Sequence, residues 1–553
     1  MSPKLANRRI RLLLTIFVVA FAATLLRAMW LQGVQARSLS RLAARQHREH
    51  VAVPAGRGAV YDRTGVQLAV GEQATTVYAD PHQVVDPRNV AVTVGRALHL
   101  NIRRVYADLL DRSRGFVYLA RKANPESAAA LARHHLAGVG FYPEERRAYP
   151  QRSVGSQVLG YAGVDNHGLS GLELSLDKTL AGRPGAETVV KDASGRTIDV
   201  VAQKQELDGR DVFLTLDHTI QANAEAVLRQ TIAEWHAKDA TAIVLDPQTG
   251  DVLAMAVAPS YDANFFPTVN RDLERNRAVT DTYEPGSTFK VVTVAGALSD
   301  GLVTPSSRFT LPYEIQVADR RVHDAEPRGT ETMTVARILS HSSNVGAITL
   351  AKLLGHERLL WWVSRFGFGH ETGIDFPGES AGILPSYWSG SSIGNVPIGQ
   401  GIAVTPIQVA SAYAAVANGG VWIRPHLVDH VSGSPRPTPT RRTVISPLVA
   451  SQLRSMLQNV VLEGTGTEAA IPGYTVAGKT GTAAKPDPHG YSDSKYVASF
   501  VGLVPATKPR LVVLVAVDEP QGAIWGGVVA APAFQKIAKF DLQYLEVPPD
   551  AQR

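Results

Sequence analysis

Ser287-Thr288-Phe289-Lys290, Ser342-Ser343-Asn344 and Lys479-Thr480-Gly481-Thr482 follow one another in this order along a chain of 553 residues. The first string alone is weak, because S-x-x-K recurs at residues 175–178 and 492–495. Only the first copy comes after a Glu-Pro-Gly stop and runs into an apolar stretch, residues 291–298, which predicts a buried helix. Residues 175–178 alternate in polarity, and residues 492–495 follow Gly-Tyr, which favours a loop.

The first string places a hydroxyl and an amine on one face of a first helical turn, where free N–H groups and the helix dipole favour an alkoxide. A serine hydroxyl is a poor nucleophile until a base takes its proton. Lys290 is the candidate base for Ser287. Because lysine titrates near about 10.4, an apolar site and a second cation must lower its pKa, and Lys479 is the candidate for that cation.

The second string supplies short polar side chains. Ser342 could relay protons between the two lysines, and the Asn344 amide could hold a peptide carbonyl or N–H group of a substrate. Taken singly, Ser342 and Asn344 also fit a polar loop after a helix that ends near residues 336–339. Their order relative to the other two motifs favours the catalytic interpretation.

The third string follows residues 474–478 and predicts a β-strand whose edge borders the site. Gly481 would let a ligand backbone approach closely. The N–H groups of Thr482 and Ser287 would form an oxyanion hole worth roughly 3 kcal/mol per donor. Thr480, Thr482 and Lys479 could hold a substrate carboxylate. A lysine that merely begins an edge strand would explain neither the paired threonines nor the motif order.

With these motifs the chain resembles the penicillin-binding serine transferases. Residues 246–255 (DPQTGDVLAM), 399–408 (GQGIAVTPIQ) and 417–420 (ANGG) are similar to stretches of that family's transpeptidase domain. Residues 57–65 (RGAVYDRTG) and 171–173 (GLE) resemble the pedestal motifs of its class B members. The resemblance covers nearly all of residues 57–534.

The resemblance implies an α+β transpeptidase fold, an antiparallel sheet flanked by helices, preceded by an elongated mixed α/β pedestal and one N-terminal transmembrane helix. It implies peptidoglycan stem peptides and lipid-linked nascent glycan as substrates, β-lactams as covalent inhibitors, and no cofactor. The chain most resembles the division-specific, FtsI-like enzymes, which implies an FtsW-like polymerase and other division proteins as partners. The elongation-specific enzymes come second.

Composition agrees with an ordinary multidomain protein, since 45% of the residues are hydrophobic and the net charge is +6. Nothing in the pattern of basic and aromatic residues favours nucleic acid. The absence of cysteine excludes disulfides and zinc–cysteine sites and is compatible with an oxidising compartment. No HExxH motif or Walker loop indicates a metal or nucleotide site.

The N-terminus carries an apolar run over residues 12–31, about 20 residues and enough to span a bilayer if Arg27 reaches the interface. The alternative is a cleaved signal peptide, because residues 20–22 form a small-x-small triplet. The apolar residues beyond the triplet favour an uncut single-pass anchor in the inner (cell) membrane. Basic residues flank both ends almost equally, so the resemblance, rather than the charge, places the catalytic part on the periplasmic, extracytoplasmic side.

We therefore expect a cytoplasmic tail over residues 1–11, an anchor over 12–31, a non-catalytic pedestal over 32–207, a transpeptidase domain over 208–545 and a tail over 546–553. Helices are predicted over residues 125–136, 219–234 and 532–542, and the sheet over 240–257, 474–482, 497–503 and 510–518. A D,D-carboxypeptidase or β-lactamase would use the same serine with water as acceptor. A catalytically idle division scaffold is the alternative of another class.

Overall fold

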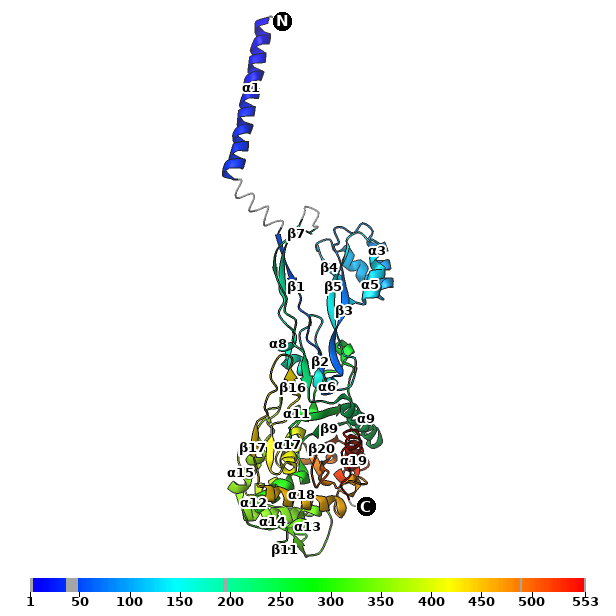
Figure 1. Cartoon of the computed structure of the whole chain (residues 1–553), viewed down its shortest axis with the longest axis vertical. Coiled ribbons are helices and arrows are strands. Elements are labelled where there is room, and N and C mark those ends of the chain that lie inside the picture. The colour runs from blue at the N-terminus through cyan, green and yellow to red at the C-terminus, as the bar shows by residue number, and fades with distance from the viewer. Residues whose placement is uncertain (1–2, 36–47, 192–196, 488–489, 552–553) are drawn as a thin grey trace. The chain divides into compact units, whose positions relative to one another are not determined.

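The computed structural model describes residues 3–35, 48–191, 197–487 and 490–551, and it forms two compact units (Figure 1). One unit consists of residues 1–56 and 182–208, and the other of residues 57–181 and 209–553. The predicted sites all fall in the second unit.

The first unit begins with helix α1 (Pro3–Met29), which continues into a π-helical turn (Trp30–Val34). Within residues 7–34, an 18-residue window has a mean hydropathy of 2.3 and none of it is buried, so this helix is long and apolar enough to cross a membrane. Strands β1 (Arg48–Val53), β6 (Gly185–Lys191) and β7 (Thr197–Lys204) form a separate antiparallel sheet in this unit.

The second unit contains a five-stranded antiparallel sheet in the order β10-β9-β20-β19-β18, as the transpeptidase fold predicts. Its strands are β9 (Asp239–Leu245), β10 (Val252–Ala258), β18 (Ala477–Asp487), β19 (Gly490–Val504) and β20 (Leu511–Asp518). The third motif lies on β18, which is an edge strand, as expected. The predicted loop at residues 492–495 is wrong, because these residues extend β19.

Helices cover both faces of this sheet. Along β9, Ala242 and Val244 join the core under α9 (His218–Trp235) and α19 (Gly526–Tyr544), whereas Ile243 and Leu245 join the core on the opposite face. The opposite core includes α12 (Lys290–Ser299), α17 (Pro406–Ala417) and α18 (Pro447–Leu462).

Two helix boundaries differ from the prediction. The C-terminal helix begins at Gly526 rather than at residue 532, and it carries Pro532 in its interior. Proline is common in the first turn of a helix, because it lacks the N–H group that interior residues donate. This preference led to the prediction that the helix begins at residue 532. Helix α5 ends at Ala132 rather than at residue 136, and His135 has a positive φ of 48°.

A mixed sheet in the order β16-β8-β2-β3-β4, with β5 also paired to β3, joins the N-terminal and catalytic halves of this unit. Strands β2 and β8 are parallel, and the other pairs are antiparallel. A small helical core rests on β3 and β4. The elements are β2 (Val60–Tyr61), β3 (Gln67–Ala79), β4 (Val117–Ala123), β5 (Val139–Ala148), β8 (Val212–Leu214), β16 (Val428–Val431), α3 (Pro87–Ala97), α4 (Ile102–Leu110) and α5 (Pro125–Ala132).

The two pedestal motifs meet in a buried ion network. Arg57 and Arg147 each contact Glu173 at 2.6 Å, and Arg57 also contacts Asp177 at 2.7 Å. Glu173 is 1% exposed, so both of its oxygens satisfy buried guanidinium groups. This network therefore joins residues that are far apart in the sequence.

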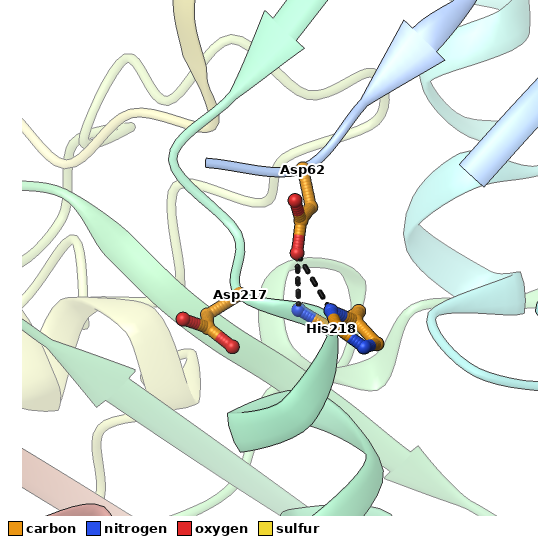
Figure 2. Close-up of side chains that lie close together, drawn as sticks. All are labelled: Asp62, Asp217 and His218. Atoms are coloured by element: carbon orange, nitrogen blue, oxygen red, sulfur yellow. Dashed lines mark hydrogen bonds and ion pairs between the residues drawn. The ribbon is translucent and has the colours of Figure 1, made fainter. Parts of the chain in front are cut away.

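Asp62, Asp217 and His218 lie together where β2 meets the start of α9 (Figure 2). Asp62 accepts hydrogen bonds from the His218 backbone at 3.1 Å and pairs with its Nδ1 at 2.8 Å. Asp217 caps α9 by accepting from the backbone N–H groups of its first turn. These bonds account for the cluster, because they join Asp62, the residue after β2, to the first turn of α9.

The remaining elements are short. They form small hairpins, short helices and turns, and several of them adjoin the second motif. They are β11 (Arg308–Leu311), β12 (Glu314–Val317), β13 (Arg320–His323), β14 (Glu331–Thr334), β15 (Val421–Ile423), β17 (Arg441–Thr443), α6 (Ser156–Leu159), α7 (Gly171–Ser175), α8 (Asp177–Leu180), α10 (Arg271–Glu274), α11 (Arg277–Thr280), α13 (Val335–Ser340), α14 (Asn344–Leu354), α15 (His356–Phe366), α16 (Ser392–Asn395), and the 3-10 turns η2 (Ala263–Thr268), η3 (Gly286–Phe289), η4 (Val396–Ile398) and η5 (Thr467–Ala469).

Candidate active site

Ser287 lies in the 3-10 turn η3, immediately before α12. The predicted α-helical first turn is therefore tighter than expected, and the Lys290 N–H group donates to the Ser287 carbonyl. Gly286 adopts a φ of 53°, a conformation that glycine accepts without strain. The turn leaves Ser287 half-buried while Lys290 is only 1% exposed.

Lys290 connects the first two motifs. Its Nζ donates to Ser342 Oγ at 3.1 Å, to Asn344 Oδ1 at 2.7 Å and to the Ser342 carbonyl. These bonds use all three hydrogens of an ammonium group. A lone pair that could accept a proton from Ser287 therefore exists only in the neutral amine.

Burial lowers the pKa of Lys290 to about 7, and the negative charge of Asp324 opposes this shift. Burial also lowers the pKa of Lys479 well below its usual value, and the charge of Lys290 adds to that effect. The predicted proximity of two cations is thus present. Desolvation, rather than the second lysine, is the main cause of the low pKa of Lys290.

Asp324 supports the second motif and was missed by the sequence analysis. Its carboxylate accepts from Ser343 Oγ and from the Val345 N–H group, each at 3.0 Å, and it pairs with Arg328 at 2.6 Å. Ser343 in turn caps α14. Asp324 lies just after strand β13, and no motif at that position points to it.

Asn344 is held on both sides. Its Oδ1 accepts from Lys290, and its Nδ2 donates to the His323 carbonyl at 2.9 Å. Its second Nδ2 hydrogen has no partner among the described residues. Ser342 has a positive φ of 57°, which turns the chain sharply between α13 and α14.

Lys479 is fully buried on β18. Its Nζ donates to Thr480 Oγ1 at 3.1 Å, and Thr480 Oγ1 also pairs with Thr465 Oγ1 at 2.7 Å. Among the residues that the structure describes, no hydrogen bond joins Lys479 to Ser342. The expected position of Ser342 between two ammonium groups is therefore seen only on the Lys290 side.

Glycines let the third motif pack closely against η3 (Gly286–Phe289), the nucleophile turn that carries Ser287. A methyl group on Gly481 would lie 2.3 Å from Ser499 Oγ and 2.9 Å from the Pro285 carbonyl oxygen. A methyl group on Gly286 would lie 2.8 Å from the Thr482 carbonyl oxygen. Gly481 is therefore required by the protein's own packing.

The stack of glycines continues on both sides. A methyl group on Gly399 would lie 2.1 Å from the Gly286 oxygen, and one on Gly526 would lie 2.4 Å from the Gly481 oxygen. Gly526 also donates its N–H group to Thr482 Oγ1 at 3.1 Å. Backbone therefore contacts backbone from residue 399 through the nucleophile turn and β18 to the start of α19.

The other two S-x-x-K strings have ordinary surroundings. Ser175 Oγ donates to the Leu172 carbonyl within a short helix. Lys495 lies on β19, 3.8 Å from Glu519. Of the three copies, the one beginning at Ser287 is brought against both other motifs.

Comparison with known proteins agrees with this arrangement. The family model "Penicillin binding protein transpeptidase domain" matches residues 240–539, and "Penicillin-binding Protein dimerisation domain" matches residues 52–214. The chain is 34% identical to the peptidoglycan D,D-transpeptidase FtsI of Escherichia coli K12, over 98% of this chain and 93% of that protein. It is also 34% identical to stage V sporulation protein D of Bacillus subtilis, over 98% of this chain and 86% of that protein. Penicillin-binding protein 3 of Mycobacterium tuberculosis, solved with ampicillin, is 31% identical with a TM-score of 0.72 over 91% of this chain and 98% of that structure.

Proposed function

The chain belongs to the penicillin-binding protein transpeptidases, as an FtsI-like class B member, and we propose that it crosslinks peptidoglycan stem peptides through a Ser287 acyl-enzyme during septal cell-wall synthesis. It is a serine-type D-Ala-D-Ala transpeptidase. The observation that carries the proposed mechanism is the contact of Lys290 with Ser342 and Asn344, directly after the turn that presents Ser287.

In the first step, Ser287 Oγ attacks the carbonyl between the two terminal D-alanines of a stem peptide. Neutral Lys290 takes the Ser287 proton, and this proton reaches the departing D-alanine amine through Ser342. The ester bond to Ser287 forms as the peptide bond breaks. The N–H groups of Ser287 and Thr482 stabilise the oxyanion.

In the second step, an amine from a neighbouring stem peptide attacks the ester. The new amide bond forms as the ester bond to Ser287 breaks, and the proton lost by the amine returns to Ser287 Oγ. Asn344 Nδ2 orients the donor peptide. This peptide lies along β18, next to Thr480, Gly481 and Thr482. Lys479, with the hydroxyls of Thr480 and Thr482, supplies positive charge and donors for the terminal carboxylate.

β-Lactams are expected to acylate Ser287 in place of the stem peptide. The Mycobacterium tuberculosis protein named above was solved with ampicillin and also with aztreonam, at 31% identity to this chain. Stable acylation, rather than turnover, would separate this chain from a β-lactamase.

The septal role rests on likeness to FtsI, and it implies an FtsW-like polymerase and other division proteins as partners. An elongation role is the alternative within class B. Depletion in the source bacterium separates the two, because loss of a septal enzyme gives filaments and loss of an elongation enzyme gives rounded cells.

Helix α1 is proposed to anchor the protein in the cell membrane, with the catalytic part outside. The boundaries proposed are a pedestal over residues 32–207 and a transpeptidase domain over residues 208–545. Cysteine placed at residue 2 or residue 548 of the cysteine-free chain, probed with a membrane-impermeant maleimide on spheroplasts, would test the orientation. Labelling at residue 548 alone is expected, and labelling at residue 2 alone would reverse the orientation.

Labelling the full chain with a fluorescent penicillin tests the mechanism. We expect a stable label on the native chain and none on Ser287→Ala. Rapid loss of the label would favour a β-lactamase or carboxypeptidase. Absence of label on a folded native chain would favour the scaffold. Ser175→Ala, in the second S-x-x-K string, is the matched control and should label normally.

A further inference from the structure

A cavity of about 420 Å³ lies beside helices α15 and α17, and none of its lining residues belongs to the three catalytic motifs. Its walls include Trp361 and Arg365 of α15, Gln408 and Ser411 of α17, Trp422 of β15 and Arg442 of β17. The volume is within the range of small-ligand sites. Two guanidinium groups and two indoles therefore line one cavity.

The two arginines are fixed in place. Arg442 lies over the Trp422 ring at 4.6 Å from its centroid, and Arg365 lies 5.6 Å from that of Trp361. Arg442 Nη1 donates to the Arg365 carbonyl, and Arg365 donates to the carbonyls of residues 443 and 444. Neutral carbonyl oxygens thus hold the guanidinium groups.

The positive charge of this pair is not neutralised. No salt bridge to Arg365 or Arg442 occurs within the described parts of the chain. Burial and the charge of Arg365 both lower the pKa of Arg442. Within the described residues, several of their guanidinium N–H groups have no acceptor, in the fork geometry that suits an oxyanion.

A second, independent observation points into the same cavity. Ser411 is 3% exposed, and its Oγ has no hydrogen-bond partner in the described residues. A buried hydroxyl without a partner is costly unless a ligand or water satisfies it. The one lining carboxylate, Glu371, lies exposed and contacts neither arginine within salt-bridge distance.

We propose that this cavity is a second ligand site, which binds an oxyanion, a carboxylate or a phosphate, between Arg365 and Arg442, with Ser411 as an additional hydrogen-bond partner. The site is separate from the transpeptidase centre and does not depend on the proposed acyl-enzyme. Two sources share this chemistry: the carboxylates of a muramyl peptide, and phosphate in free or esterified form.

Isothermal titration calorimetry on the detergent-solubilised full chain tests the site with two probes, N-acetylmuramyl-L-alanyl-D-isoglutamine and inorganic phosphate. We expect saturable binding of at least one probe, and the probe that binds more tightly identifies the source. Arg442→Gln and Arg365→Gln should each weaken that binding at least tenfold. Glu371→Gln should strengthen it, because it removes the one negative charge at the rim.

Arg441→Gln is the matched control, since Arg441 is an exposed neighbour on the same short strand and does not line the cavity. Its binding should equal that of the native chain. Penicillin labelling of every variant reports whether it is folded, and Arg365 is exposed enough that its replacement should not unfold the protein. Failure of both probes to bind, or unchanged binding in a folded Arg365→Gln chain, would overturn the proposal.

Discussion

Lys290 and Asn344 are joined by a hydrogen bond of 2.7 Å between Nζ and Oδ1, across 54 positions of sequence. The bond ties the end of the nucleophile turn to the first residue of α14. Lys290 is buried, and no carboxylate among the described residues bonds to it, so its amine is held by neutral oxygens. Burial of the amine favours its neutral form, which is the form required of a base.

The rate of acylation should therefore depend on pH through Lys290. Its pKa of about 7 means that the base form is lost as the pH falls below that value. We expect the second-order rate constant with penicillin to fall about tenfold per pH unit below about pH 7, and to level off above it. Stopped-flow labelling measures this profile. A rate independent of pH between 5 and 8 would contradict the role of Lys290.

Asp324→Asn should move that profile toward lower pH. The carboxylate of Asp324 opposes the fall in the pKa of Lys290, so its removal lowers this pKa further. The variant should also be less stable, because Arg328 loses its buried partner. Asp319→Asn, on the exposed turn between β12 and β13, is the matched control. A midpoint that stays in place in Asp324→Asn would show that Asp324 has only a structural role.

Gly481→Ala should lower both stability and acylation. The new methyl group would lie 2.3 Å from Ser499 Oγ and 2.9 Å from the Pro285 carbonyl, so β18 must move away from the nucleophile turn. Overpacking of this kind costs about 1–3 kcal/mol. Urea unfolding and penicillin labelling measure the two effects. Gly329→Ala, where the methyl group would meet no atom within 4 Å, should change neither.

Glu173→Gln should destabilise the pedestal. Arg57 and Arg147 would both lose a carboxylate at 2.6 Å while staying buried, a change that costs about 3–5 kcal/mol. The exposed pair of Arg146 and Glu72 provides the contrast, and Glu72→Gln should cost less than about 1 kcal/mol. Equal unfolding midpoints for the two variants would refute the importance of burial. Denaturant unfolding monitored by circular dichroism makes the comparison.

The catalytic strand and its neighbours could be predicted from the sequence, because apolar runs bounded by turn residues mark strands of a buried sheet. The family resemblance supplied the antiparallel arrangement, which periodicity alone could not. The extension of β18 and β19 could not be predicted. Residues 490–496 are polar and glycine-containing, and they become strand because they pair with residues 484–487 across the hairpin.

Within the candidate site, the three motifs predict roles for Ser287, Lys290 and Lys479, since these residue types have a clear chemical task. The residues that hold them had no such signal. Asp324 and Thr465 act through side-chain contacts that depend on the folded chain. Of the two expected causes of the low pKa of Lys290, the apolar surroundings are found, whereas the charge of Lys479 does not contribute to that shift.

The run of backbone contacts through residues 399, 286, 481 and 526 bears on how drug resistance could arise in this enzyme. A methyl group added at Gly286, Gly399 or Gly481 would lie less than 3.0 Å from a neighbouring atom, so no conservative replacement of these glycines can adjust the distance between the nucleophile turn and β18 by a small amount. Variants that admit the natural peptide but exclude a β-lactam must therefore change residues farther out, such as those of the hairpin beyond Ala484. The backbone contacts at the glycines tolerate little change, so we expect resistance substitutions at residues that surround these contacts.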